Sequence, residues 1–249
     1  MSYLFLPGLL CDAAVWQSVL SQFPRDEVSV VDYGDADSID AMAKVVLQSS
    51  PERFVLVGHS MGGLVALEVC RQAPERVSHL VLLDTGYKAL PKDHKGEQEK
   101  ASLLALLALA KEKGMAVMGR QLLAEMVHPD RLKDDPLVSS ILAMMERQTL
   151  ATFTAQVNAL LQRPDGTCVL REVACPVLLM CGRQDSWTPV SLHEAMLLLV
   201  PDGELHVIEE SGHMTSMEQP QAVVSQLQAW LALNQAGLNQ ADEERESLI

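Results

Sequence analysis

Residues 54–67 read Phe-Val-Leu-Val-Gly-His-Ser-Met-Gly-Gly-Leu-Val-Ala-Leu, and this stretch decides the fold. An apolar, β-branched run ends at Gly58, and an amphipathic helical pattern begins just after Ser60. Chance alone places a Gly-x-Ser-x-Gly pentapeptide in about one chain in ten of this length, so the flanking strand and helix carry the argument. Together they predict a nucleophile elbow, a strained turn that holds the Ser60 hydroxyl exposed above a sheet. Gly58 and Gly62 flank the serine because a Cβ at either position would collide where strand and helix cross.

The composition is that of an α/β protein with one sizeable core. The chain has 249 residues, of which 48% are hydrophobic and 21% charged, and its net charge is −14. An acidic surface repels phosphate backbones and anionic lipid headgroups, so we expect no nucleic-acid or membrane partner. The odd set of five cysteines has no CxxC spacing, which favours reduced thiols over disulfides or a metal site. The first residues lack a signal-peptide pattern and no apolar window reaches transmembrane length, so we expect a cytoplasmic protein.

Apolar runs and helical patterns alternate along most of the chain. Strands are predicted at residues 3–6, 28–31, 54–59, 77–83, 176–181 and 204–208, and helices at 12–23, 39–49, 61–73, 190–199 and 220–233. Asp12 and Ser38 stand where helix N-caps are expected. This alternation predicts an α/β fold with a mostly parallel six-stranded sheet and helices on both faces.

The alternation stops between residues 87 and 172. This segment contains no convincing buried strand and reads as helices at 100–113, 115–127, 136–149 and 151–163, rich in Leu, Ala and Met. We therefore expect a discontinuous core formed by residues 1–86 and 173–233, interrupted by a helical segment at 87–172. Residues 234–249 are polar and acidic and are expected to form a flexible tail.

Two later stretches supply the partners that a nucleophilic serine needs. A serine hydroxyl requires a base held by a third group, and the order for this type of sheet is serine, acid, histidine. Asp185 follows the predicted strand 176–181, and His213 follows the last predicted strand. We expect Ser60 to attack, His213 to act as the base and Asp185 to orient the imidazole. Asp84, at the end of another strand, is the alternative acid.

Two further expectations concern the residues beside the serine. His59 is predicted to be structural, with its side chain pointing away from the Ser60 hydroxyl. An oxyanion hole needs two preorganised N–H donors, and we assign them to the backbone of Met61, at the start of the helix, and of Leu9, with Leu10 as second choice. A glycine at position 8 then allows the backbone to come close to the reacting carbonyl.

These motifs resemble the α/β-hydrolase superfamily, in its compact carboxylesterase and lactonase branch with a helical cap. The resemblance covers about residues 2–233 and rests on Leu6–Leu10, Gly58–Gly63, Ala73–Val77, Gly182–Asp185 and Ser211–His213. It implies that residues 87–172 form the cap over the active site. The chain lacks the usual N-terminal hairpin, so residues 28–31 should form an exposed edge strand, and Pro7-Gly8 replaces the usual His-Gly.

The substrate pocket is harder to predict because apolar helix stripes also build cores. The main candidates are Leu10, Met126, Met145, Phe153 and Trp187, and further candidates are Leu9, Met61, Leu122 and Met144. Arg120, Arg147 and Arg163 are capable of binding a carboxylate, although solvated positions are favoured for them. Leu64 stands where the related menaquinone-pathway lyases carry an arginine, which argues against a lyase.

The sequence therefore predicts a serine hydrolase of the carboxylesterase type. It would cleave small or medium carboxylic esters, lactones included, through an acyl-enzyme, without a metal or an organic cofactor. A C–C bond hydrolase or cofactor-free lyase on the same three residues is one alternative. A non-catalytic ligand-binding receptor on the same fold is another. As an enzyme, the protein would have a small-molecule ester or lactone as its partner. The sequence does not predict the oligomeric state of the protein.

Overall fold

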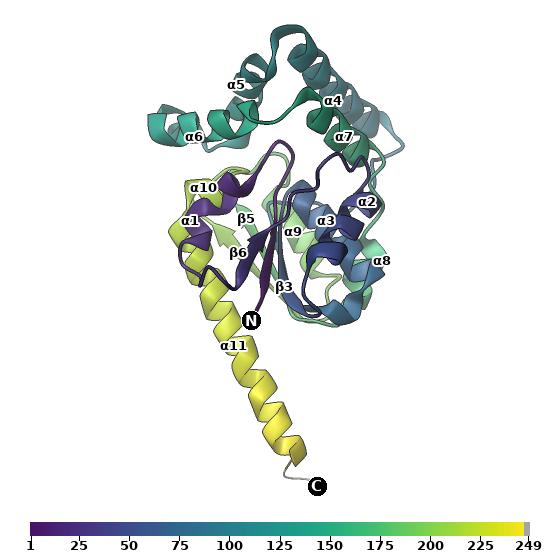
Figure 1. Cartoon of the computed structure of the whole chain (residues 1–249), viewed down its shortest axis with the longest axis vertical. Helices are drawn as coiled ribbons and strands as arrows, with labels where there is room; N and C mark the ends of the chain where they lie inside the picture. Colours follow the sequence, from purple (N-terminus) through teal and green to yellow (C-terminus); the bar gives the residue numbers. More distant parts are fainter. Residues whose placement is uncertain (247–249) are drawn as a thin grey trace.

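The computed structural model describes residues 1–246, and a single parallel sheet lies at its centre (Figure 1). The six strands have the order β2-β1-β3-β4-β5-β6, and every neighbouring pair is parallel. Their bounds are β1 Tyr3–Leu6, β2 Val28–Val30, β3 Phe54–His59, β4 Val77–Leu83, β5 Val177–Gly182 and β6 Gly203–Ile208. The predicted sheet is confirmed, including its edge strand β2, which is one residue shorter than expected.

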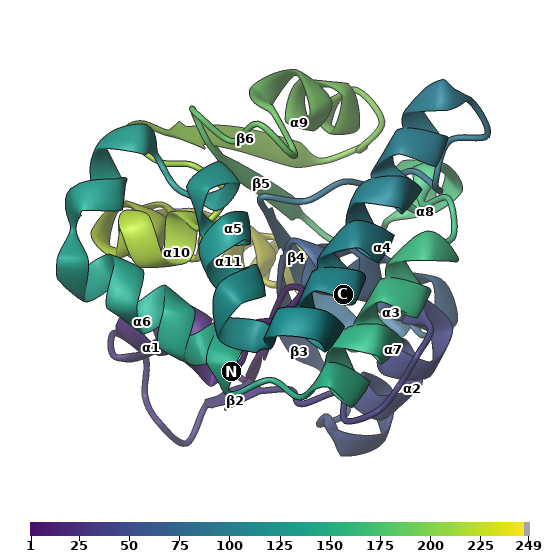
Figure 2. The same cartoon turned by 90° about the horizontal axis from the view of Figure 1, so that it is seen from above.

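Helices cover both faces of the sheet and one end of it (Figures 1 and 2). Their bounds are α1 Gln17–Leu20, α2 Ile39–Ser49, α3 Met61–Gln72, α4 His94–Lys113, α5 Met115–Met126, α6 Asp135–Glu146, α7 Leu150–Leu161, α8 Thr167–Glu172, α9 Val190–Leu197, α10 Thr215–Glu218 and α11 Pro220–Glu246. Three short 3₁₀ helices lie at Ala13–Trp16, Pro74–Arg76 and Pro129–Lys133. No helix among the described residues is long and apolar enough to span a membrane.

Alternate residues of the strands belong to two separate hydrophobic cores, one on each face of the sheet. Tyr3 and Phe5 of β1 pack with Trp16 and with Trp230 of α11 on one face of the sheet. Their neighbours Leu4 and Leu6 pack with residues of α2, α3 and α9 on the other face. Because side chains of a strand point alternately to opposite faces, a strand buried on both sides must be apolar throughout. This explains the continuous apolar runs in the sequence.

Helix α8 is not predicted, and three predicted helices differ from the structure by more than three residues. The predicted helix 12–23 is a 3₁₀ turn followed by the short α1, although Asp12 does cap it by accepting from the Ala14 N–H at 2.8 Å. Helix α4 starts six residues early, because Asp93 caps a first turn whose polar residues have no apolar period. Helix α11 does not end near Leu233 but continues to Glu246, through a stretch rich in the helix formers Ala, Gln and Glu. Residues 247–249 of the predicted tail lie outside the described residues.

The helical insertion, residues 87–172, contains α4 to α8 and separates β4 from β5. Helices α4, α5, α6 and α7 form a layer above the carboxyl end of the sheet, with α6 over α1 and α7 over α3 (Figures 1 and 2). Helix α8 instead lies low beside α3, and its Leu170 belongs to the core shared with α3 (Figure 1). As predicted, the described structure assigns no strand between residues 87 and 172.

Candidate active site

Ser60 occupies the turn between β3 and α3, with φ 53° and ψ −119°. This positive φ is costly for a residue with a side chain and is held by neighbouring hydrogen bonds. The Ser60 N–H donates to the Leu83 carbonyl at 3.0 Å, and the Thr85 hydroxyl donates to the Ser60 carbonyl at 2.6 Å. A Cβ at Gly58 would meet the backbone of Gly62, and one at Gly62 would meet the backbone at Leu6. The strained turn and the reason for its glycines are as the sequence predicts.

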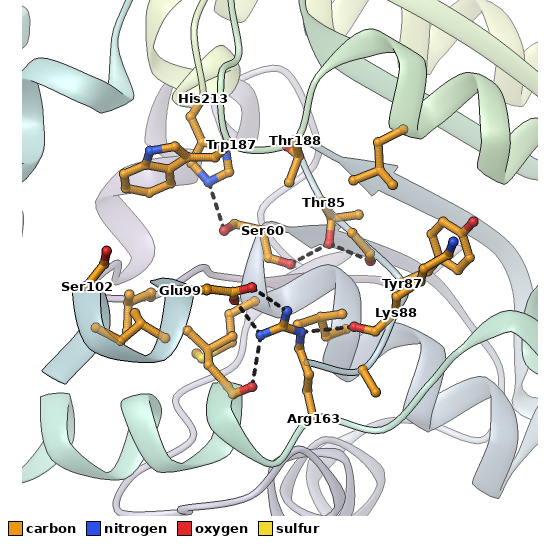
Figure 3. A pocket seen from close by; sticks show the side chains of 18 of the residues that line it. Ser60, Thr85, Tyr87, Lys88, Glu99, Ser102, Arg163, Trp187, Thr188 and His213 are labelled. Carbon is orange, nitrogen blue, oxygen red and sulfur yellow. Dashed lines mark hydrogen bonds and ion pairs between the residues drawn. The ribbon is translucent and has the colours of Figure 1, made fainter. Parts of the chain in front are cut away.

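The side chains of Ser60, His213 and Asp185 form one hydrogen-bonded chain (Figure 3 shows the first two). The distance from Ser60 Oγ to His213 Nε2 is 2.8 Å, and that from His213 Nδ1 to Asp185 Oδ2 is also 2.8 Å. The three residues follow β3, β5 and β6, whose carboxyl ends meet at one edge of the sheet. His213 is 2% and Asp185 3% exposed, so water competes little for these bonds. A hydroxyl, an imidazole and a carboxylate in this arrangement can perform nucleophilic catalysis.

Asp185 is held in its ionised form by several donors. Its Oδ1 accepts from the N–H groups of Trp187 and Thr188 at 2.9 and 3.0 Å, and its Oδ2 accepts from the Thr188 hydroxyl at 2.5 Å. Burial alone would raise the pKa of Asp185, but His213 and these donors bring it well below the usual value. Conversely, burial lowers the pKa of His213, but the Asp185 carboxylate raises it above the ordinary value.

Asp84, the alternative acid, does not contact the imidazole of His213. Its carboxylate accepts from the Gly182 N–H at 2.9 Å and from the Thr215 hydroxyl and N–H at 2.9 and 3.2 Å. Burial raises the pKa of Asp84 well above the usual range. Asp84 thus joins the end of β5 to the segment after β6 by hydrogen bonds, which is a structural role.

His59 precedes the serine and holds the backbone of His213. Its Nε2 lies 2.8 Å from the His213 carbonyl, and because a carbonyl only accepts, Nε2 carries the proton. Burial lowers the pKa of His59 to about 3, so the ring is neutral. This agrees with the structural role predicted for His59.

Glu218 is a buried carboxylate that sequence reasoning missed. Its Oε1 accepts from the N–H groups of Gly212 and Met214, on either side of His213, at 2.9 and 3.2 Å. Its Oε2 accepts from the His128 N–H of the helical insertion at 2.7 Å. The His213 N–H itself donates to the Met126 carbonyl at 2.6 Å. A glutamate five residues after the histidine, next to Met217, was the available signal.

Two backbone N–H groups near Ser60 are available to a ligand. Leu9 and Met61 both line the cavity beside the serine, and neither N–H has an acceptor among the described residues. The Leu10 N–H, the second choice, donates to Gln156 Oε1 at 2.8 Å and is therefore occupied. The geometry thus favours the N–H of Leu9 over that of Leu10 as the second donor, beside Met61, of the predicted oxyanion hole.

A cavity of about 520 Å³ opens at Ser60 and His213. Of the predicted pocket residues, Trp187 lines it, as do Leu9, Met61, Leu122 and Arg163. Four predictions are wrong, because these side chains are at most 2% exposed in the core cluster and none lines the cavity: Leu10, Met126, Met145 and Phe153. Met144 is buried in the same cluster.

The cavity wall also contains residues that the prediction did not name. They are polar or come from the loop after β4 and from α4: Tyr87, Lys88, Glu99, Ser102, Leu103 and Leu106. Of the other two arginines considered, Arg147 pairs with Asp12 at 2.9 Å and Arg120 is exposed. Within residues 1–246, no group of three or more His, Cys, Asp or Glu side chains could hold a metal ion.

Comparisons with known proteins agree with this geometry. The model of the alpha/beta hydrolase family matches residues 4–226. The pimeloyl-[acyl-carrier protein] methyl ester esterase of Vibrio campbellii is 26% identical over 237 residues, covering 91% of this chain and 93% of the relative. The enzyme of the same name from Nitrosomonas europaea is 29% identical, covering 88% and 91%. A thermophilic esterase from Thermogutta terrifontis shares the fold, with a TM-score of 0.82 and 24% identity over 93% of this chain and 89% of that one.

Proposed function

The chain belongs to the alpha/beta hydrolase family, and we propose that it is a serine carboxylesterase that cleaves small or medium esters through an acyl-enzyme. The relatives named as methyl ester esterases support an ester with a small alcohol group. The observation that carries the proposal is the pair of 2.8 Å hydrogen bonds that joins Ser60, His213 and Asp185.

In the first half of the reaction, Ser60 Oγ attacks the ester carbonyl while His213 Nε2 takes its proton. Asp185 holds His213 Nδ1 as a donor and stabilises the imidazolium that forms. The N–H groups of Leu9 and Met61 stabilise the oxyanion, since both lie at the cavity and have no other partner among the described residues. His213 then gives the proton to the leaving alcohol.

In the second half, water takes the place of the alcohol. His213 Nε2 removes a proton from the water as it attacks the acyl-enzyme carbonyl, and the same two N–H groups stabilise the second oxyanion. The collapse of this intermediate releases the carboxylic acid and returns the proton to Ser60 Oγ. The helical insertion acts as the cap in this proposal, because α4 and α5 supply Leu103, Leu106 and Leu122 to the cavity wall.

The first test removes the nucleophile. Ser60→Ala should lower kcat/KM for p-nitrophenyl butyrate by about three orders of magnitude or more. A fluorophosphonate probe should label the wild type at Ser60 and leave this variant unlabelled. Ser102→Ala is the matched control, because Ser102 also lines the cavity but its hydroxyl makes no hydrogen bond to a histidine of the described residues. This control should keep both activity and labelling.

The same two assays separate the alternatives. Labelling of Ser60 without turnover of any acyl ester would contradict the esterase proposal and favour a C–C bond hydrolase. A folded protein that the probe does not label would favour a non-catalytic receptor. Full activity in Ser60→Ala would remove Ser60 from the mechanism. A panel of lactones then tells whether cyclic esters are also substrates.

A further inference from the structure

The wall of the cavity contains an ion pair that the proposed reaction does not use. Arg163, just after α7, and Glu99, on α4, both line the cavity (Figure 3). The distances are 2.6 Å from Arg163 Nη1 to Glu99 Oε1 and 3.0 Å from Nη2 to Oε2, so the pair is bidentate. The Arg163 side chain is only 12% exposed, whereas that of Glu99 is 41% exposed.

The guanidinium of Arg163 has almost no donor left for a ligand. Of its five N–H groups, two bind Glu99, one donates from Nη1 to the Leu160 carbonyl at 3.0 Å, and Nε donates to the Lys88 carbonyl at 2.9 Å. Its charge is neutralised by the Glu99 carboxylate. Arg163 therefore offers a substrate carboxylate neither free charge nor a free bidentate face.

The rest of the wall also disfavours a negative group. Glu125 lines the cavity as a second carboxylate and makes no ion pair with any described residue. Lys88 is the other lining cation, and its Nζ lies over the Tyr87 ring at 5.4 Å from the centroid. Leucine is the most frequent residue type in the cavity wall, and Leu103 and Leu106 are among these leucines. The two lining carboxylates, Glu99 and Glu125, offset the two lining cations, so an acyl chain ending in a carboxylate would lose its water without meeting a net positive wall.

We propose that Glu99 determines specificity: by occupying Arg163 it restricts the cavity to esters of uncharged acyl chains. The inference rests on the proposed esterase function. Without the Glu99 carboxylate, a buried guanidinium faces the cavity with its charge and its bidentate face free. Such a group binds carboxylates through paired N–H donors. The same cavity would then accept monoesters of dicarboxylic acids.

The test compares two esters that differ only at the far end of the acyl chain. Methyl hexanoate and monomethyl adipate have the same alcohol and the same six-carbon acyl length. Wild type should prefer methyl hexanoate by at least about tenfold in kcat/KM, because the adipate carboxylate is desolvated without a partner. Glu99→Gln keeps the shape of the side chain and should shift this ratio about 10- to 100-fold toward adipate, mainly through KM.

Two controls separate this effect from a general change of charge. Glu125→Gln removes the other lining carboxylate and should change the ratio by no more than about threefold, since no arginine is released. The double variant Glu99→Gln with Arg163→Gln should lose the gain for adipate. A Glu125→Gln shift as large as that of Glu99→Gln would overturn the inference, as would a gain that persists in the double variant.

Failure of the inference is distinct from failure of the proposed function. Equal hydrolysis of both esters by wild type overturns the role of Glu99 and leaves the esterase intact. No hydrolysis of either ester by folded wild type overturns the esterase proposal and, with it, this inference. If Glu99→Gln does not fold, Glu99→Ser replaces it, and the wild-type ratio already decides whether uncharged chains are preferred.

Discussion

The carboxyl edge of the sheet and the helical insertion both face the cavity, but the sequence predicts them unequally. At the sheet edge, Ser60 comes one residue after β3, Asp185 three after β5 and His213 five after β6. Each side chain is placed by a short turn after a strand whose position in the sheet is fixed. In the insertion, Leu122 lines the cavity, while Met126, one turn further along α5, is buried in the core.

The difference between the sheet edge and the insertion shows which features of a structure can be predicted from a sequence. A strand followed by a glycine-rich turn constrains the backbone, and backbone constraints place a side chain to within hydrogen-bond reach. An apolar helical stripe indicates only that its side chains are shielded from water. Side chains in a cavity wall and in a packed core are both shielded, so the stripe does not predict where a given leucine lies.

Apart from the loss of the nucleophile, the largest effect expected at the sheet edge comes from the acid. Asp185→Asn should lower kcat about 10³- to 10⁴-fold, because the imidazole loses both its tautomer and its counter-charge. The base must be neutral to act, so activity rises with pH through the pKa of His213, which Asp185 raises. Removing that carboxylate should therefore move the rising limb to lower pH. The measurement is kcat/KM between pH 5 and 9.

Asp84→Asn provides the comparison, because Asp84 hydrogen-bonds Gly182 and Thr215 and not the imidazole. It should cost stability more than catalysis and lower the pH midpoint less than Asp185→Asn does, because Asp84 contributes less than Asp185 to the raised pKa of His213. If Asp84→Asn abolished activity in a folded protein while Asp185→Asn remained active, the acid would have been assigned to the wrong strand.

The sequence alone predicts the sheet, the edge strand and the residues that meet at Ser60, because each follows from a local pattern. It does not predict Glu218, since that role depends on the N–H groups of Gly212 and Met214 together with that of His128, which is far away in the sequence. It also misplaces Leu10, Met126, Met145 and Phe153, whose side chains turn into the core. Leu9 and Leu10 differ in the same way: only the position of Gln156 shows which N–H is already used.

Glu218 connects the two regions, so altering it tests whether they act together. In Glu218→Gln, the remaining oxygen can still accept from Gly212 and Met214, but the amide group would face the His128 N–H, a donor against a donor. We expect kcat to fall about tenfold with little change in KM, since such a contact is worth about 1–2 kcal/mol. The loss of a charge near His213 should also lower its pKa slightly.

Steady-state kinetics over the same pH range measures both effects. Glu209→Gln is the matched control: Glu209 also follows β6, but it is exposed and pairs with Arg183 at the surface. That variant should behave as wild type. An unchanged kcat and pH profile in Glu218→Gln would mean that the insertion and the base are independent.

The smallest effects on catalysis are expected inside the insertion, where two substitutions separate its core from its cavity wall. Phe153 is fully buried, so Phe153→Ala should lower the free energy of unfolding by about 3–5 kcal/mol.

Leu106 is only partly buried and lines the cavity. Leu106→Ala should cost about 1 kcal/mol or less and change kcat/KM only a few-fold, with the preference moving toward longer p-nitrophenyl esters as the cavity widens. Urea unfolding and an acyl-chain series measure the two quantities. If Phe153→Ala altered chain-length preference while Leu106→Ala altered only stability, the assignment of these side chains to core and wall would be reversed.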